Sequence, residues 1–198
     1  MKDYRFFGIF LGMISLGLLS FFIFSAGYYP IGSVNGSFIT SRQFRKDYRA
    51  NFSYYTNIKA YKPALFSENT DITVMNLQLS VLNQLVDTMV IGKAARQELG
   101  KEFDRLLAGK IDRFNDDLEF QRGAETLYGL DFEDFKRGIL IPQAEKDLLT
   151  ARLILRGEKI DEWLTAARKE STVKIFSGDF IWEEGQVKLR DPKEERKQ

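Results

Sequence analysis

The chain begins with a long segment that has no charged side chain. Residues 6–26 are apolar or small, and as a helix they would rise about 31 Å, close to the roughly 30 Å of hydrocarbon in a bilayer. Lys2 and Arg5 precede the segment and the next basic residue is Arg42, so the positive-inside rule predicts a cytoplasmic N-terminus. We therefore expect residues 1–27 to form a short cytoplasmic stub and a transmembrane signal-anchor, with the rest of the chain outside the cytoplasm.

Two features of this segment leave alternatives open. A signal peptide could be cleaved after Ala26, although Phe24 stands where a small residue is preferred. Gly8 and Gly12 have the GxxxG spacing that lets two helices pack closely. A weak dimer is therefore an alternative to a helix without a specific partner.

Helical periodicity dominates the chain after this segment. Thr40 and Gln43 have the spacing of a capping box, which predicts the start of a helix. A long apolar helix is predicted over residues 72–99, ended by Gly100. Shorter helices are predicted over residues 101–123, from 131 to 157 with a break or a new start at Pro142, and over 160–167.

Short strands are predicted near both ends of this helical region. Residues 31–34 precede an Asn35-Gly36 turn, and residues 173–176 form a late strand. Residues 180–183 and 186–189 are predicted to form a hairpin around Glu184-Gly185. We expect the early strand to pair with the late one.

Composition excludes several classes of protein. Lys and Arg number 29 and Asp and Glu number 28, for a net charge of +1, whereas a nucleic-acid-binding protein should carry a basic excess on one face. The chain has no cysteine and no histidine, which excludes disulfides, cysteine–zinc sites and histidine-dependent catalytic triads. We therefore predict no nucleic-acid partner.

The acidic pairs do not indicate a catalytic site. Asp116–Asp117 and Glu183–Glu184 are adjacent in sequence, and adjacent side chains point apart on a helix or a strand. No other motif favours catalysis or a bound cofactor. We predict a protein without enzymatic activity, catalytic residues, cofactor or metal ion.

Short motifs spread over residues 34–156 have a common order and spacing. They are Val34-Asn35-Gly36, Ile39-Thr40 with Phe44, Leu82–Asp87, Ala94–Gly100, Phe120-Gln121 and Tyr128–Phe135. Together they resemble the SurA N-terminal (SurA/PpiD-like) periplasmic chaperone domain. Residues 101–115 depart from the family pattern. The short connection from Leu148–Gly157 to the helix at Ile160 leaves no room for the parvulin prolyl-isomerase domain that family members often carry.

The resemblance and the apolar segment together give the expected fold, which is mainly α. A single N-terminal transmembrane helix is followed by a SurA-N-like helical domain over residues 28–176, with a small β-element formed by N- and C-terminal strands. Residues 177–189 are expected to form a β-hairpin extension and residues 190–198 a disordered charged tail. The expected location is the bacterial inner membrane, with the domain outside the cytoplasm.

The resemblance implies a chaperone without isomerase activity. Such a holdase would be anchored through residues 6–26 and would bind unfolded or newly exported polypeptides. An alternative is an adaptor that binds one defined partner in an envelope or translocon-associated complex. The number of different clients distinguishes the two hypotheses.

The candidate client-binding residues form an aromatic row and an apolar line on two predicted helices. Large, soft apolar side chains suit the binding of varied clients, although packing in the domain core is the alternative for each of them. Arg42, Lys46 and Arg49 lie on another side of the first helix, either as a solvated face or against anionic lipid headgroups. The candidates are Phe44, Tyr48, Phe52, Tyr55, Met75, Leu79, Leu82, Val86 and Met89.

Overall fold

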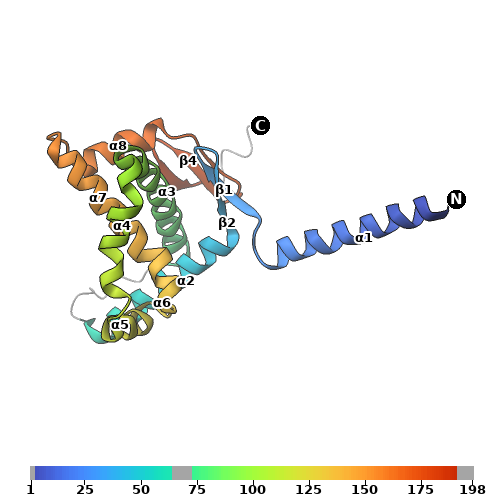
Figure 1. The fold of residues 1–198 in the computed structure, drawn as a ribbon, viewed down its shortest axis with the longest axis horizontal. Coiled ribbons are helices and arrows are strands. Elements are labelled where there is room, and N and C mark those ends of the chain that lie inside the picture. The colour runs from blue at the N-terminus through green and yellow to red at the C-terminus, as the bar shows by residue number, and fades with distance from the viewer. Residues whose placement is uncertain (1–2, 64–72, 191–198) are drawn as a thin grey trace.

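A computed structural model describes residues 3–63 and 73–190 of the chain, with side chains described from Ile9 onward. Helix α1 (Asp3–Ser25) extends away from a body that contains the other helices and the strands (Figure 1). The predicted tail at 190–198 lies outside the described residues, apart from Arg190.

The described chain is mainly helical with small sheets, as predicted. The longer helices of the body are α2 (Ser41–Tyr61), α3 (Val74–Leu99), α4 (Phe103–Ile111), α5 (Leu118–Tyr128), α7 (Ile141–Leu155) and α8 (Ile160–Glu170). The short helical elements are η2 (Gly100–Glu102), η3 (Asp112–Phe114), α6 (Phe132–Phe135) and the π-helical turn η4 (Lys136–Leu140). The strands are β1 (Pro30–Val34), β2 (Ser37–Thr40), β3 (Val173–Ile175), β4 (Phe180–Glu183) and β5 (Gln186–Leu189).

The structure does not support the predicted transmembrane helix. Within the described ranges, no helix combines the length and the apolar character needed to cross a membrane. The predicted inner-membrane location, with a cytoplasmic N-terminus and an extracytoplasmic domain, depended on this helix and is not supported either.

Side-chain caps explain where α2 and α3 begin. Thr40 Oγ1 accepts a hydrogen bond from the Gln43 N–H at 3.2 Å, so the predicted cap of α2 is present. Thr73 Oγ1 accepts one from the Asn76 N–H at 3.2 Å and begins α3. Pro142 lies in the first turn of α7, directly after the π-helical turn η4.

A three-stranded antiparallel sheet joins the two ends of the body. Its strand order is β2-β1-β3, and Val34 pairs with Val173, so the early strand meets the late one as predicted. Asn35 and Gly36 both have positive φ and form the tight turn between β1 and β2. The Asn35 side chain also accepts a hydrogen bond from the Thr172 N–H at 2.9 Å, which fixes the turn against the start of β3.

Helix α3 lies at the centre of the body (Figure 1). It contacts α2, α7, α8, β1 and β5. Its buried side chains on one side form a core with β1, β2 and the β4–β5 hairpin, and those nearer its C-terminus form a second core with α4 and α7. The buried side chains of α3 are Leu77, Val81, Leu82, Leu85, Val86, Val90, Ile91, Ala95 and Leu99.

Two polar side chains of α3 attach the C-terminal elements to it. Asn83 Nδ2 donates to the Val187 carbonyl at 3.2 Å, and Asn83 Oδ1 accepts from the Val187 N–H at 2.9 Å. One turn further along, Asp87 accepts a hydrogen bond from Arg168 Nε at 2.5 Å and pairs with the rest of that guanidinium. The hairpin and α8 are therefore docked on α3 by specific polar contacts as well as by apolar packing.

We predict that Asn83→Ala destabilises the protein by about 2 kcal/mol, because the half-buried backbone groups of Val187 lose their partner. Chemical denaturation measures this change in the free energy of unfolding. Hydrogen exchange should show faster exchange at β5 than in the unsubstituted chain. Ser80→Ala, at an exposed position of the same helix, is the control and should change stability by less than about 0.5 kcal/mol. Equal destabilisation by both substitutions would contradict the assigned role of Asn83.

Candidate functional site

Helix α2 is fixed between α3 and α5, which decides which of its sides faces solvent. Asn51 Nδ2 donates to Gln84 Oε1 of α3 at 3.3 Å. On the other side, Asn57 Nδ2 donates to the Thr126 carbonyl of α5 at 2.8 Å. The Tyr54 ring stacks on Tyr128 with 4.8 Å between centroids. These contacts hold α2 in one rotation about its axis.

The predicted aromatic row is present along α2. The ring centroids of Phe44 and Tyr48 lie 6.3 Å apart, and those of Tyr48 and Phe52 lie 6.4 Å apart in a stacked arrangement. Phe44 and Tyr48 are half-buried and pack against the core, whereas Phe52 is 52% exposed. Tyr55 is half-buried, with Lys59 Nζ 5.9 Å from its ring centroid. The row therefore runs from the core to the surface.

The predicted apolar line on α3 is mostly enclosed. Leu82 and Val86 are core residues, so a client cannot reach them in this conformation. Leu79 and Met89 are half-buried against the same core. Met75 is 39% exposed because it lies in the first turn of α3. The structure thus does not bring the nine predicted residues together as one open groove.

The exposed apolar side chains that the sequence did not single out include Val74 and Phe38. Val74, beside Met75 in the first turn of α3, is 62% exposed. Phe38 on β2 is also exposed, while its neighbour Ile39 is completely buried. Successive side chains of a strand point to opposite faces. Since Ile39 belongs to the buried face, this alternation would have predicted that Phe38 is exposed.

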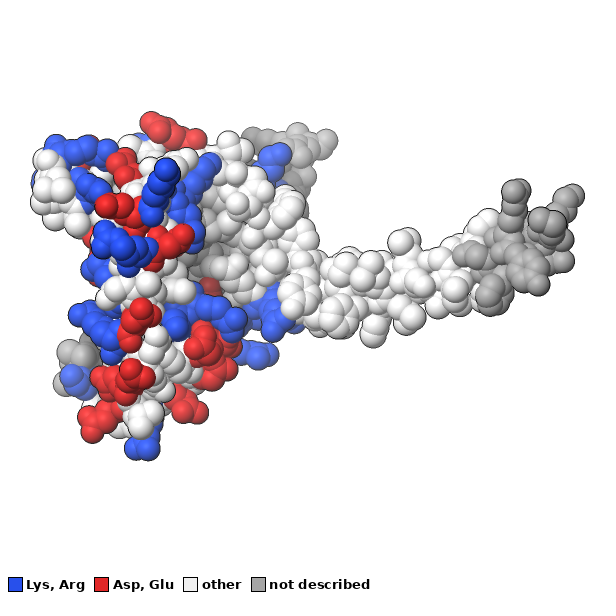
Figure 2. Space-filling model, viewed as in Figure 1, with Lys and Arg blue, Asp and Glu red and all other residues white. Residues whose placement is uncertain are grey.

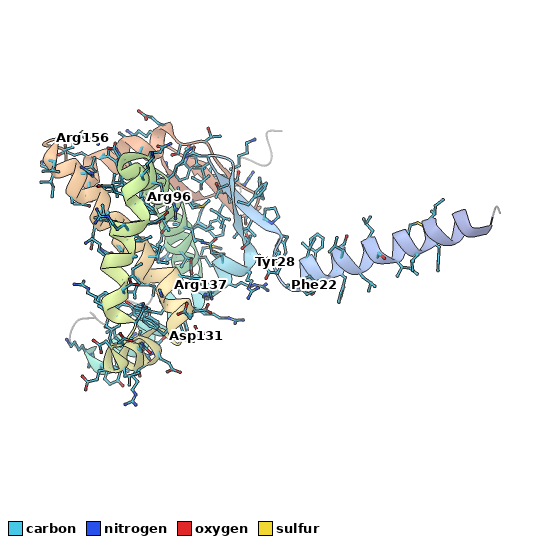
Figure 3. The ribbon with its side chains drawn as sticks, in the orientation of Figure 1. Phe22, Tyr28, Arg96, Asp131, Arg137 and Arg156 are labelled. Carbon is cyan, nitrogen blue, oxygen red and sulfur yellow. The ribbon has the colours of Figure 1, made fainter. Side chains whose placement is uncertain are left out.

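A cleft of about 980 Å³ lies where the first half of α2 faces the segment before α7. Tyr28, Arg137 and Asp131 are among the residues that line it. Figure 3 shows Tyr28 where α1 joins the body, with Arg137 and then Asp131 lower on the body. The remaining lining residues are Thr40, Arg42, Gln43, Arg45, Lys46, Asp47, Arg49, Gly129, Leu130, Asp134 and Gly138.

Basic side chains dominate this cleft but differ in their partners. Lys46 Nζ lies 2.5 Å and Arg137 Nη2 2.7 Å from Asp134 Oδ1, and hydrogen bonds from Lys46 and then Arg137 lower the pKa of that carboxyl. Arg42 instead donates to the Tyr28 hydroxyl and lies over its ring. Figure 2 shows Lys and Arg gathered where α1 joins the body, below an uncharged surface.

Asp47 is the unusual acidic group of the cleft. Burial raises the pKa of its carboxyl from 3.8 to about 6, an effect that the positive charge of Lys46 partly offsets. Gly138 lies against it, since a Cβ there would be 3.6 Å from Asp47 Oδ1. Asp47 therefore changes its charge at a higher pH than an ordinary aspartate does.

A second, smaller cavity of about 360 Å³ lies between the β1–β2 turn, α3 and α7. Glu145 of α7 lines it and is only 6% exposed. Its carboxylate rests on Gly92 of α3, where a Cβ would be 2.6 Å from Oε2, and Arg96 Nη2 lies 3.4 Å from Oε1. Burial raises the pKa of Glu145, and Arg96 opposes this shift. Gly92 thus permits a close helix–helix contact through a buried carboxylate.

No metal centre is formed in the part of the chain that the structure describes, because no three acidic side chains converge there. Comparison with known proteins gives no match to a family model, to a curated protein or to a solved structure. The resemblance to the SurA N-terminal domain, and the predicted absence of enzymatic activity, therefore stay predictions.

We predict that Asp47→Asn removes part of the pH dependence of stability. Because the pKa of Asp47 is higher in the folded state, the unsubstituted protein loses stability as pH rises from about 4 to 7, by roughly 1–3 kcal/mol from this group. The variant should be more stable than the unsubstituted chain at pH 7 and similar to it at pH 4. Urea denaturation across this pH range measures both. Asp116→Asn, at an exposed position, should leave the profile unchanged. Parallel profiles for all three proteins would contradict the burial of Asp47.

Proposed function

We propose that this protein binds unfolded polypeptide segments and keeps them from aggregating. The observation that carries the proposal is the stacked aromatic row of α2, which ends in the exposed ring of Phe52. The exposed Val74 and Met75 on the neighbouring α3 add apolar surface of the same kind. The resemblance of residues 34–156 to a chaperone domain supports the same function.

The chemistry of these side chains suits weak binding to varied sequences. Phenylalanine presents a large rigid apolar face, and methionine adapts its shape to different partners. Since Tyr48 anchors the Phe52 ring from below and packs on the core, the exposed aromatic surface is held in place before a client arrives. Pre-organisation of this kind lowers the entropy cost of binding.

The expected affinity is low. Covering about 400 Å² of apolar surface would contribute roughly 10 kcal/mol before ordering costs. The loss of translational and rotational freedom and the ordering of a flexible client remove most of this free energy. A protein with such a surface would release its clients readily, as a holdase without an energy source must.

The proposed mechanism has no bond-forming step. Binding shields apolar segments of the client from one another, and release returns the client unchanged. The alternative function is an adaptor that uses the same surface for one folded partner. The two differ in whether unrelated unfolded proteins are bound, and that difference guides the test.

We predict that the full-length chain suppresses light scattering by two unrelated aggregating proteins at near-stoichiometric ratios. The double variant Phe52→Ser/Met75→Ser should need about a tenfold higher concentration for the same effect, since loss of about 1.4 kcal/mol of binding free energy lowers affinity tenfold. Both positions are exposed, so the fold should be retained, which circular dichroism and thermal unfolding would check.

A matched control distinguishes this surface from apolar exposure in general. Ile154 and Leu155 at the end of α7 are 65% and 78% exposed, so Ile154→Ser/Leu155→Ser removes comparable exposed apolar surface elsewhere. This control should suppress aggregation as well as the unsubstituted chain does. If the unsubstituted chain suppresses the aggregation of neither client, the proposed function is rejected. If both double variants lose the same amount of suppression, the proposed site is rejected.

A further inference from the structure

Helix α2 presents arginines directly beside its aromatic row. Residues three or four positions apart are neighbours on a helix surface. Arg45 is therefore a neighbour of Tyr48 and Arg49, and Arg49 is a neighbour of Phe52. Arg45, Arg49 and Phe52 are all exposed. A polypeptide that covers the Phe52 ring would thus pass close to two guanidinium groups.

These arginines differ from the other basic groups of the cleft in having no acidic partner. Lys46 and Arg137 share the carboxylate of Asp134. By contrast, Arg42 bonds to the Tyr28 hydroxyl, and in the described part of the chain neither Arg45 nor Arg49 has a hydrogen-bond or ion-pair partner. Three guanidinium groups therefore line the cleft with hydrogen-bond donors that no carboxylate of the described chain uses.

The acidic residues of the cleft do not neutralise the charge of these arginines. Asp134 is occupied by Lys46 and Arg137, and Asp131 Oδ1 accepts the Asp134 N–H at 2.7 Å at the start of α6. The Asp47 carboxyl lies toward Gly138, and the lining of the cleft has five basic side chains against three acidic ones. The open side of the cleft therefore has an excess of positive charge.

Local packing orients Arg42 and Arg45 and leaves them without a carboxylate partner in the described chain. The Arg45 guanidinium occupies the space that a Cβ at Gly27 would fill, so it packs against the backbone just after α1. The Arg42 guanidinium lies 5.1 Å from the centroid of the Tyr28 ring. Both contacts restrict the side chains, and a restricted guanidinium loses less entropy when it binds a carboxylate.

From this arrangement we infer that α2 selects polypeptide segments in which Asp or Glu flanks apolar residues. The apolar part of the segment covers Phe52 and the flanking carboxylates meet Arg42, Arg45 and Arg49 across the cleft. A guanidinium group can donate two parallel hydrogen bonds to one carboxylate. The contact therefore depends on orientation as well as on charge. The inference names the client class of the proposed function and rests on it.

Charge complementarity identifies the ligand as acidic rather than neutral or basic. Each exposed pair contributes little on its own, so the preference arises from several weak contacts and is sensitive to salt. A basic segment would meet like charges at the same place. All clients make the apolar contact. Their relative affinities therefore depend on the charge next to their apolar segments.

The test uses the full-length chain and three fluorescently labelled peptides of equal length. The peptides share one apolar, aromatic centre and differ in flanks of Glu, Gln or Lys. Fluorescence anisotropy at low salt should show the Glu peptide binding about tenfold more tightly than the Gln peptide, and the Lys peptide most weakly. Raising the ionic strength from about 0.05 M to about 0.5 M should bring the three affinities close together.

Substitutions assign the preference to α2. The variant Arg42→Gln/Arg45→Gln/Arg49→Gln should bind the Gln peptide normally and lose the preference for the Glu peptide. Because Arg42 and Arg45 contact the segment after α1, Arg49→Gln alone is the second variant, and it should reduce the preference about twofold to threefold. The control Lys101→Gln/Lys169→Gln/Lys174→Gln removes the same charge from exposed positions of η2, α8 and β3 and should keep the preference.

The outcomes separate the two proposals. If none of the peptides binds, both the proposed function and this inference are rejected. If the peptides bind with equal affinity, or if the control variant loses the preference as much as the α2 variants do, the inference is rejected while polypeptide binding stands. Loss of the preference in the α2 variants alone, with the Gln peptide still bound, supports the inference.

Discussion

The structure depends on the burial of α3 over most of its circumference. Apolar side chains surround this helix, so α2, α7, α8, β1 and β5 all pack on it. Two of its polar positions attach the C-terminal elements, since Asn83 bonds both backbone groups of Val187 and Asp87 binds Arg168. Its apolar side chains are buried because elements from both ends of the sequence cover the helix.

The same packing explains why the candidate surface lies on α2. Helix α3 uses its apolar side chains in the core, whereas α2 packs mainly against α3 and α5 and keeps an exposed side. The aromatic row of α2 therefore begins in the core at Phe44 and ends in solvent at Phe52. Because Phe44 and Tyr48 are fixed by the core, the exposed ring of Phe52 is held in place. A weak polypeptide-binding surface requires this rigidity.

The electrostatics of the cleft follow from its place between α2 and the segment before α7. Asp134 draws in Lys46 and Arg137, which leaves the arginines on the outer side of α2 without a carboxylate in the described chain. Burial raises the pKa of Asp47 to about 6, so this carboxyl is protonated at a higher pH than an ordinary aspartate. Apolar and cationic surface consequently meet along a single helix.

Local signals in the sequence predicted much of the fold. The capping residues of α2, the glycine that ends α3, the Asn35-Gly36 turn and the β4–β5 hairpin are decided by neighbours within a few residues, and the structure confirms each. The pairing of β1 with β3 was also predictable, because both short strands needed a partner. The transmembrane helix, expected from the length of an uncharged apolar segment with basic residues before it, is not supported among the described residues.

The sequence by itself determined where the helices and turns begin and which residues are apolar. Only the tertiary structure decided which of those apolar residues remain exposed. Periodicity placed Leu82, Val86, Phe52 and Met75 on apolar helix faces alike, but the first two are buried and the last two are not. The spacing of apolar residues identifies one face of one helix. Exposure depends in addition on which segments, distant in the sequence, pack against that face.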